Sequence, residues 1–298
     1  MKPHWQYALC GACLLCATSY GQVAKQETPS SGQAVQIYLT AADRHESPIK
    51  PDLSQLSFSL DNQAVQAISL RSADEDTLLF AVLVDMSGSQ AKEAALLKET
   101  ASQLFRDLLN GRNVGRLVVF NDQVAVSSAP PRLSELQSAL DTLQFLGETV
   151  LYDAIAVTCT KVLSRAGNPR TPRRAIFLIT DGLDDRSTMN EARAEEIAED
   201  EGVAVFSLQV IGEGMNGAET RRATHFLQKI ASDTGGAFFH PKRPEQGVSL
   251  LLNAVHRQWA LGVLPSQPPD QKQHSFAVKS AEKDVRVSAP VKISLQVM

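Results

Sequence analysis

Four side chains that carry oxygen stand at positions where a divalent cation could be bound. Asp85, Ser87 and Ser89 follow one strongly apolar segment of the chain, and Asp181 follows a second. Hard cations such as Mg²⁺ prefer oxygen ligands, and neither His nor Cys belongs to this set. The set therefore predicts a site for Mg²⁺, with Mn²⁺ or Ca²⁺ as alternatives.

The elements that must position these residues alternate between strands and helices. Continuous apolar runs at 78–84 and 175–179 are typical of strands buried on both faces of a sheet. Strands that alternate with helices of about ten or more residues imply crossover connections. The sequence therefore predicts an α/β fold with a Rossmann-like, doubly wound, mainly parallel sheet flanked by helices. Further strands are expected at 114–120, 123–127, 203–210 and 237–239, and helices at 92–109, 134–143, 151–163, 190–200, 220–232 and 246–257.

These four residues, together with Thr149, resemble a known metal site in their order. Asp85-x-Ser87-x-Ser89 is similar to the opening motif of the metal-ion-dependent adhesion site of von Willebrand factor type A domains. That site also uses a Thr on a later loop and an Asp after a later strand, and Thr149 and Asp181 match in order and approximate spacing. The resemblance covers about residues 77–260. It is closest to bacterial exported proteins called VWFA-related, which also carry strands before and after the domain.

The resemblance implies how the site would work. Ser87, Ser89 and Thr149 would bind the ion through hydroxyls, and Asp85 and Asp181 would act directly or through water. Neutral hydroxyls leave a divalent cation incompletely neutralised, so an Asp or Glu carboxylate of a protein partner can complete its shell. The implied function is capture of a protein partner through the cation, and the chain is not expected to be an enzyme.

Other interpretations of these residues stay open. Asp85 and Ser87 are also preferred residues at helix starts, although capping does not account for the other three. A Mg²⁺-dependent phosphohydrolase that uses Asp85 is an alternative, but Ser87 stands where that chemistry normally has a second acid. A structural subunit with a vestigial metal site is another. Glu148 stands where relatives often have Gly, and its carboxylate would either strengthen cation binding or repel an acidic ligand.

Segments on both sides of the predicted domain have the alternating pattern of half-buried strands. Runs at 35–39, 56–60 and 64–70 alternate between apolar and polar residues, and so do runs at 275–279 and 285–287. The two ends of the chain are therefore expected to pair into one small β-module beside the main domain. The expected boundaries are 33–74 for the first β segment, 75–262 for the α/β domain and 263–298 for the second β segment.

The N-terminus has the pattern of a secretory signal peptide. Residues 1–21 contain one Lys, a short apolar run and then small residues before Gln22. Residues 22–32 are polar and are expected to form a flexible tether. The chain is therefore expected to be exported, and periplasmic or secreted, with lipidation of the N-terminus left open. Three of the four cysteines lie in this leader, where a metal cluster is not expected: Cys10, Cys13 and Cys16.

Composition excludes several other classes. With 298 residues, 43% of them hydrophobic and 21% charged, the chain is long enough and apolar enough for a globular core. Its net charge of −4 gives no broad basic surface, so nucleic acid is not an expected partner. No run after the leader reaches about 18 apolar residues, so no transmembrane segment is expected. Cys159 lies on the apolar face of a predicted helix and is expected to be a buried thiol.

Overall fold

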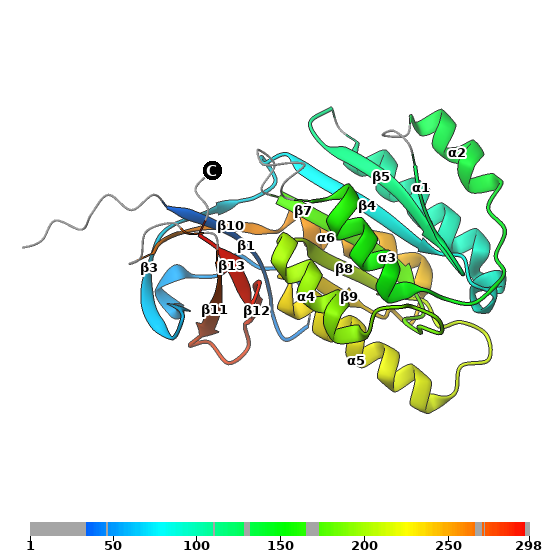
Figure 1. Ribbon diagram of the computed structural model, residues 1–298. Coiled ribbons are helices and arrows are strands. Elements are labelled where there is room, and N and C mark those ends of the chain that lie inside the picture. The colour runs from blue at the N-terminus through cyan, green and yellow to red at the C-terminus, as the bar shows by residue number, and fades with distance from the viewer. Residues whose placement is uncertain are drawn as a thin grey trace, which may run out of the picture. The chain divides into compact units, whose positions relative to one another are not determined.

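The computed structural model describes residues 34–45, 47–109, 111–127, 132–164, 173–265, 270 and 272–295. The predicted signal peptide at 1–21 and tether at 22–32 lie outside these residues. The described chain forms two sheets, one of six strands and one of seven (Figure 1). None of the helices in the described ranges has both the length and the hydropathy that a bilayer crossing requires.

The six-stranded sheet carries the predicted ligand positions. Its order is β6-β5-β4-β7-β8-β9, and β4 and β7 are its two central strands. Both are buried along their whole length and run parallel, with Val84 beside Ile179. Residues that follow them therefore emerge at the same edge of the sheet. The strands are β4 Leu78–Asp85, β5 Val114–Phe120, β6 Val124–Val126, β7 Arg173–Thr180, β8 Ala204–Gln209 and β9 Ala237–Phe239, of which only β6 is antiparallel to its neighbour.

Helices cover both faces of this sheet. One apolar cluster includes residues of α1, α2 and α6, and another includes residues of α3, α4 and α5 (Figure 1). The fold is therefore the predicted α/β arrangement with a mainly parallel sheet between helices. The helices are α1 Ala94–Leu108, α2 Leu133–Asp141, α3 Leu151–Val157, α4 Glu191–Glu201, α5 Gly217–Asp233 and α6 Gly247–His256, with a π-helical turn at Thr158–Val162 and 3-10 turns η1 Leu53–Gln55, η2 Gly88–Glu93 and η4 Pro244–Gln246. Cys159 is fully buried beside α3, as expected.

The seven-stranded sheet is the predicted β-module. All its pairings are antiparallel, in the order β12-β1-β10-β3-β2-β11-β13. Asp61 and Asn62 have positive φ angles, as a tight hairpin turn between β2 and β3 requires. Strands from both ends of the chain thus form one sheet, as predicted. They are β1 Val35–Ala42, β2 Leu56–Leu60, β3 Gln63–Ser72, β10 Trp259–Leu264, β11 Gln273–Ser280, β12 Arg286–Ser288 and β13 Lys292–Ser294.

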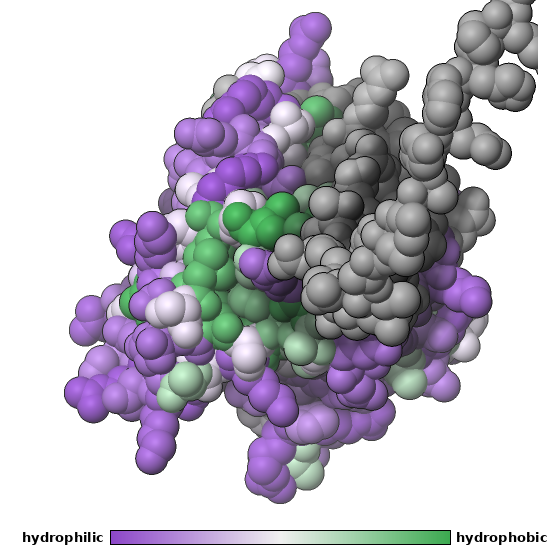
Figure 2. Space-filling view, turned by 90° about the vertical axis from the view of Figure 1, so that its left-hand side faces the viewer, coloured by the Kyte–Doolittle hydropathy of each residue, from purple (hydrophilic) through white to green (hydrophobic). Residues whose placement is uncertain are grey.

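One central strand of the β-module comes from a segment for which no strand was predicted. β10 follows α6 directly and lies between β1 and β3, so the expected boundary at residue 262 falls inside it. A β-bulge near Gly262 leaves Ile68 of β3 without a partner in the ladder, and its side chain is 48% exposed. Figure 2 shows the side of the molecule on which this sheet lies, where apolar residues gather in an area surrounded by polar ones.

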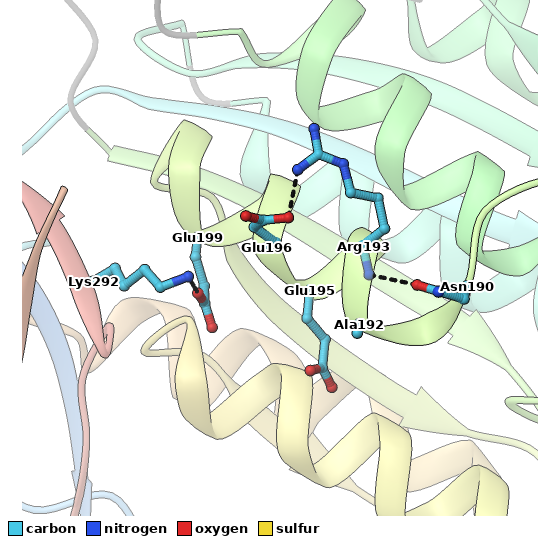
Figure 3. A pocket seen from close by; sticks show the side chains of 7 residues that line it. All are labelled: Asn190, Ala192, Arg193, Glu195, Glu196, Glu199 and Lys292. Carbon is cyan, nitrogen blue, oxygen red and sulfur yellow. Dashed lines mark hydrogen bonds and ion pairs between the residues drawn. The ribbon is translucent and has the colours of Figure 1, made fainter. Parts of the chain in front are cut away.

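Charged side chains join the β-module to the helices of the α/β domain. The Lys292 ammonium of β13 lies 2.7 Å from a Glu199 oxygen of α4 (Figure 3). Both residues line a hollow of about 480 Å³ together with other residues of α4. In the same hollow Arg193 pairs with Glu196. The charges that Figure 3 shows facing this hollow are thus largely neutralised by their neighbours.

Candidate functional site

Four of the five predicted ligands are connected at the carboxyl ends of β4 and β7. The Ser89 hydroxyl donates to Oδ2 of Asp181 at 2.7 Å, and it lies 3.1 Å from the Ser87 hydroxyl. Oδ1 of Asp85 accepts from the Ser87 amide at 2.9 Å, and Oδ2 accepts from the Thr180 hydroxyl at 2.6 Å. The parallel register of the two strands therefore brings residues 85–89 and 180–181 into one polar cluster.

The loop that carries Thr149 is joined to this cluster by backbone hydrogen bonds. The Gly88 amide donates to the Gly147 carbonyl at 2.9 Å, which ties the loop before Thr149 to residues 85–89. The Thr149 carbonyl accepts from the amides of Asp185 and Arg186, which follow Asp181. Thr149 is 2% exposed. The structure thus places its loop against both segments that carry the other four residues.

The electrostatic environment of the two carboxylates favours a cation. Asp85 and Asp181 are both fully buried, and their recorded hydrogen-bond donors are neutral amides and hydroxyls. Burial, followed by the nearby charge of Asp181, raises the pKa of Asp85 to about 7. A divalent cation would supply the positive charge that these donors lack.

Two further residues of the site were not predicted from the sequence. Gln90 is fully buried, and its Nε2 donates to Oδ2 of Asp181 and to the carbonyl of Val210, both at 3.0 Å. A Cβ atom at Gly212 would lie 2.3 Å from that same Asp181 oxygen, so the loop can pass this close only as Gly. Gln90 thus orients Asp181, and Gly212 leaves room for it. A Gln and a Gly near a motif are too common to single out without the fold.

The structure also bears on the other interpretations of single residues. Ser87 is at the N-cap position of η2, yet its hydroxyl makes no cap hydrogen bond and instead lies beside Ser89. Glu148 is exposed, and its carboxylate is paired with Arg186 at 2.7 Å. Its charge is therefore compensated by a neighbour. Asp184, in the loop after Asp181, accepts hydrogen bonds from Tyr152 and Ser187.

The donor set fits a hard cation and no softer one. Two carboxylates and three hydroxyls supply only oxygen, the ligand type of Mg²⁺, Mn²⁺ and Ca²⁺. Within the described ranges no group of three or more Asp, Glu, His or Cys side chains gathers as a metal cluster. The hydroxyls of Ser87, Ser89 and Thr149 are thus needed to make up a coordination shell here.

Comparison with known proteins shows which family the sequence matches. The family model of the von Willebrand factor type A domain matches residues 80–252. The structure matches that of an aerotolerance-related membrane protein from Bacteroides fragilis at 18% identity, over 61% of this chain and 99% of that chain, with a TM-score of 0.44. It also matches proximal thread matrix protein 1 from the mussel byssus at 15% identity, over 73% of this chain and 50% of that chain, with a TM-score of 0.48. No curated protein gives a significant match.

Proposed function

The chain belongs to the von Willebrand factor type A domain family, and from that premise we propose that it captures a protein partner through a divalent cation. Domains of this family are generally interaction modules and not enzymes. The observation that carries the proposal is the meeting of Asp85, Ser87, Ser89 and Asp181 at one sheet edge, with two fully buried carboxylates that accept hydrogen bonds from neutral amides and hydroxyls.

The residues that would hold the cation are the three hydroxyls and two carboxylates already described. A bound Mg²⁺ supplies an electrophilic centre that can accept a carboxylate oxygen from a partner. Ser87, Ser89 and Thr149 add no negative charge, so they leave the cation less neutralised than a shell of carboxylates alone would. Asp85 is held by Ser87 and Thr180, and Asp181 by Ser89 and Gln90. These contacts fix both carboxylates before any ligand arrives.

The first prediction concerns the cation itself. Calorimetric titration of the intact chain should show Mg²⁺ binding, and Asp181→Ala should abolish it because a fully buried carboxylate of the site is removed. Asp284→Asn, which removes an exposed carboxylate of the β-module, is the matched control and should bind Mg²⁺ like the wild type. A chain that binds no divalent cation would instead favour a structural subunit with a vestigial site.

Partner capture is tested separately. A pull-down from the native cell envelope should retain a protein in Mg²⁺ and lose it in EDTA or with the Asp85→Ala variant. The same variant addresses the phosphohydrolase alternative. Asp85 is fully buried, and both of its oxygens accept hydrogen bonds, which disfavours its use as a nucleophile. Hydrolysis of a phosphate ester that disappears in Asp85→Ala would nevertheless reverse the assignment.

Export belongs to the same proposal. Residues 1–21 have the charge, apolar run and small residues of a signal peptide. A partner in the periplasm or outside the cell would then be the one that meets this site. Intact mass of the protein recovered from the periplasm or medium tests the cleavage, since the mature chain should begin at Gln22.

A further inference from the structure

The helix that follows Thr149 has no cap in its own sequence. α3 begins at Leu151, and its N-cap residue is Val150, whose side chain cannot accept a hydrogen bond. The first amides of a helix have no partner within the helix and need one elsewhere. They find it in the loop that follows Asp181.

Asp184 and Ser187 provide these partners. Oδ1 of Asp184 accepts from the Tyr152 amide at 3.2 Å, and the Ser187 hydroxyl accepts from the Asp153 amide at 3.0 Å. The same hydroxyl donates to Asp184, which joins the two acceptors. The loop after one predicted ligand thus caps the helix after another.

Asp153, on α3, in turn accepts hydrogen bonds from the loop that follows Asp181. Its carboxylate accepts from the amide of Thr188 at 2.9 Å and from that of Met189 at 3.0 Å. The Thr149 carbonyl adds hydrogen bonds from Asp185 and Arg186 at 2.9 and 3.0 Å. Side chains of each segment thus accept hydrogen bonds from backbone amides of the other, so the loop after Asp181 and the start of α3 are joined in both directions.

We propose that Asp184 and Asp153 are positioning residues of the cation site. This inference rests on the proposed cation binding. Asp184, in the loop after Asp181, holds the start of α3, which follows Thr149. Asp153, on α3, holds the loop that follows Asp181. Together the two carboxylates fix the Thr149 hydroxyl relative to the Asp181 carboxylate. Loss of either one removes part of the hydrogen bonding that joins the two segments. Groups that orient metal ligands in this way commonly change metal affinity by about 10-fold or more.

The test is calorimetric titration of Mg²⁺ into the full chain. Asp184→Ala and Asp153→Ala should each bind Mg²⁺ about 10-fold more weakly than the wild type. Asp184→Asn should lose less, because its amide oxygen can still accept from Tyr152. Asp185→Ala is the matched control, since Asp185 contributes to this network through its backbone amide. It should bind like the wild type.

One further variant separates positioning from general loss of stability. His274→Gln removes a side chain that is hydrogen-bonded to Asp61 and Asp270 in the β-module. It should lower the melting temperature in EDTA without changing Mg²⁺ affinity. If Asp184→Ala does not fold, Asp184→Asn and Ser187→Ala replace it. Folded variants of Asp184 and Asp153 with wild-type Mg²⁺ affinity would overturn the inference. Failure of the wild-type chain to bind Mg²⁺ would refute the proposed function as well, so the two failures are distinguishable.

Discussion

Gln90 is the residue whose role at the site can be tested most directly. Its amide donates to Asp181 and to the Val210 carbonyl, and Gln90→Leu removes both donors while keeping a similar volume. Mg²⁺ affinity should fall by about 10-fold, because a ligand carboxylate loses the group that orients it. Calorimetric titration measures the effect. Gln66→Leu, at an exposed position on β3, is the control. Unchanged Mg²⁺ affinity in Gln90→Leu would show that Asp181 needs no such support.

The same residue shows how far the sequence can predict a site. Asp85, Ser87, Ser89, Thr149 and Asp181 are predicted as ligands because their order resembles the adhesion-site motif and because they stand near the ends of predicted strands or the start of a helix. Gln90 acts on a residue 91 positions away, and Asp184 on one 32 positions away. These pairs become visible only when the fold brings distant segments together. Residue type and spacing can thus propose candidate ligands, but not the distant groups that contact them.

A buried histidine joins three elements of the β-module and makes its stability depend on pH. His274 of β11 lies 2.7 Å from an oxygen of Asp61 in the β2–β3 turn and 2.8 Å from one of Asp270. These hydrogen bonds, that to Asp61 first, raise the pKa of His274 above 6.5. They also lower the pKa of Asp61 and of Asp270 below 3.8. At pH 5.5 the imidazole is therefore mainly protonated and both carboxylates are mainly ionised.

The sign of the pH dependence follows from these directions. A raised histidine pKa gives stability that is complete below about 6.5 and is lost as pH rises through the folded-state pKa. The lowered carboxylate pKa values give stability that is lost only as pH falls through them. His274→Gln should therefore lower the melting temperature by a few degrees at pH 5.5 and by less at pH 9. Thermal unfolding of both proteins in EDTA measures this, and equal losses at the two pH values would contradict it.

Among the strands, those with a clear apolar pattern could be predicted from the sequence, and β10 could not. The central strands β4 and β7 are continuous apolar runs, and their alternation with helices fixed the sheet class in advance. β10 reads Trp-Ala-Leu-Gly-Val-Leu directly after a helix, with no turn residues and no alternation to separate it from that helix. Its place between β1 and β3 depends on pairing with strands from the start of the chain. Such pairing leaves little signal in a local pattern.

A buried arginine contributes to the connection between the β-module and the α/β domain. Arg173 begins β7 and is 3% exposed. Its guanidinium donates to the carbonyls of Ala73 and Val255 and to the side chain of Gln258 at the start of the β10 segment. One side chain thus links a strand of the α/β domain to the chain entering and leaving the β-module. We expect the two parts to unfold together because of this link.

Two probes can follow the two parts separately. Trp259 fluorescence reports on the β-module, since Trp259 lies on β10, and far-ultraviolet circular dichroism reports mainly on the helices of the α/β domain. In the wild type the urea transitions should coincide.

Arg173→Ala should lower the free energy of unfolding by about 3 kcal/mol, because it leaves buried carbonyls without donors, and should separate the transitions. Arg173→Lys should lower the free energy of unfolding by less than Arg173→Ala does, since an ammonium keeps a donor but lacks the guanidinium's planar set of donors. Arg286→Ala, at an exposed position on β12, should change neither quantity. Coincident transitions with an unchanged midpoint in Arg173→Ala would show that other contacts couple the β-module to the α/β domain.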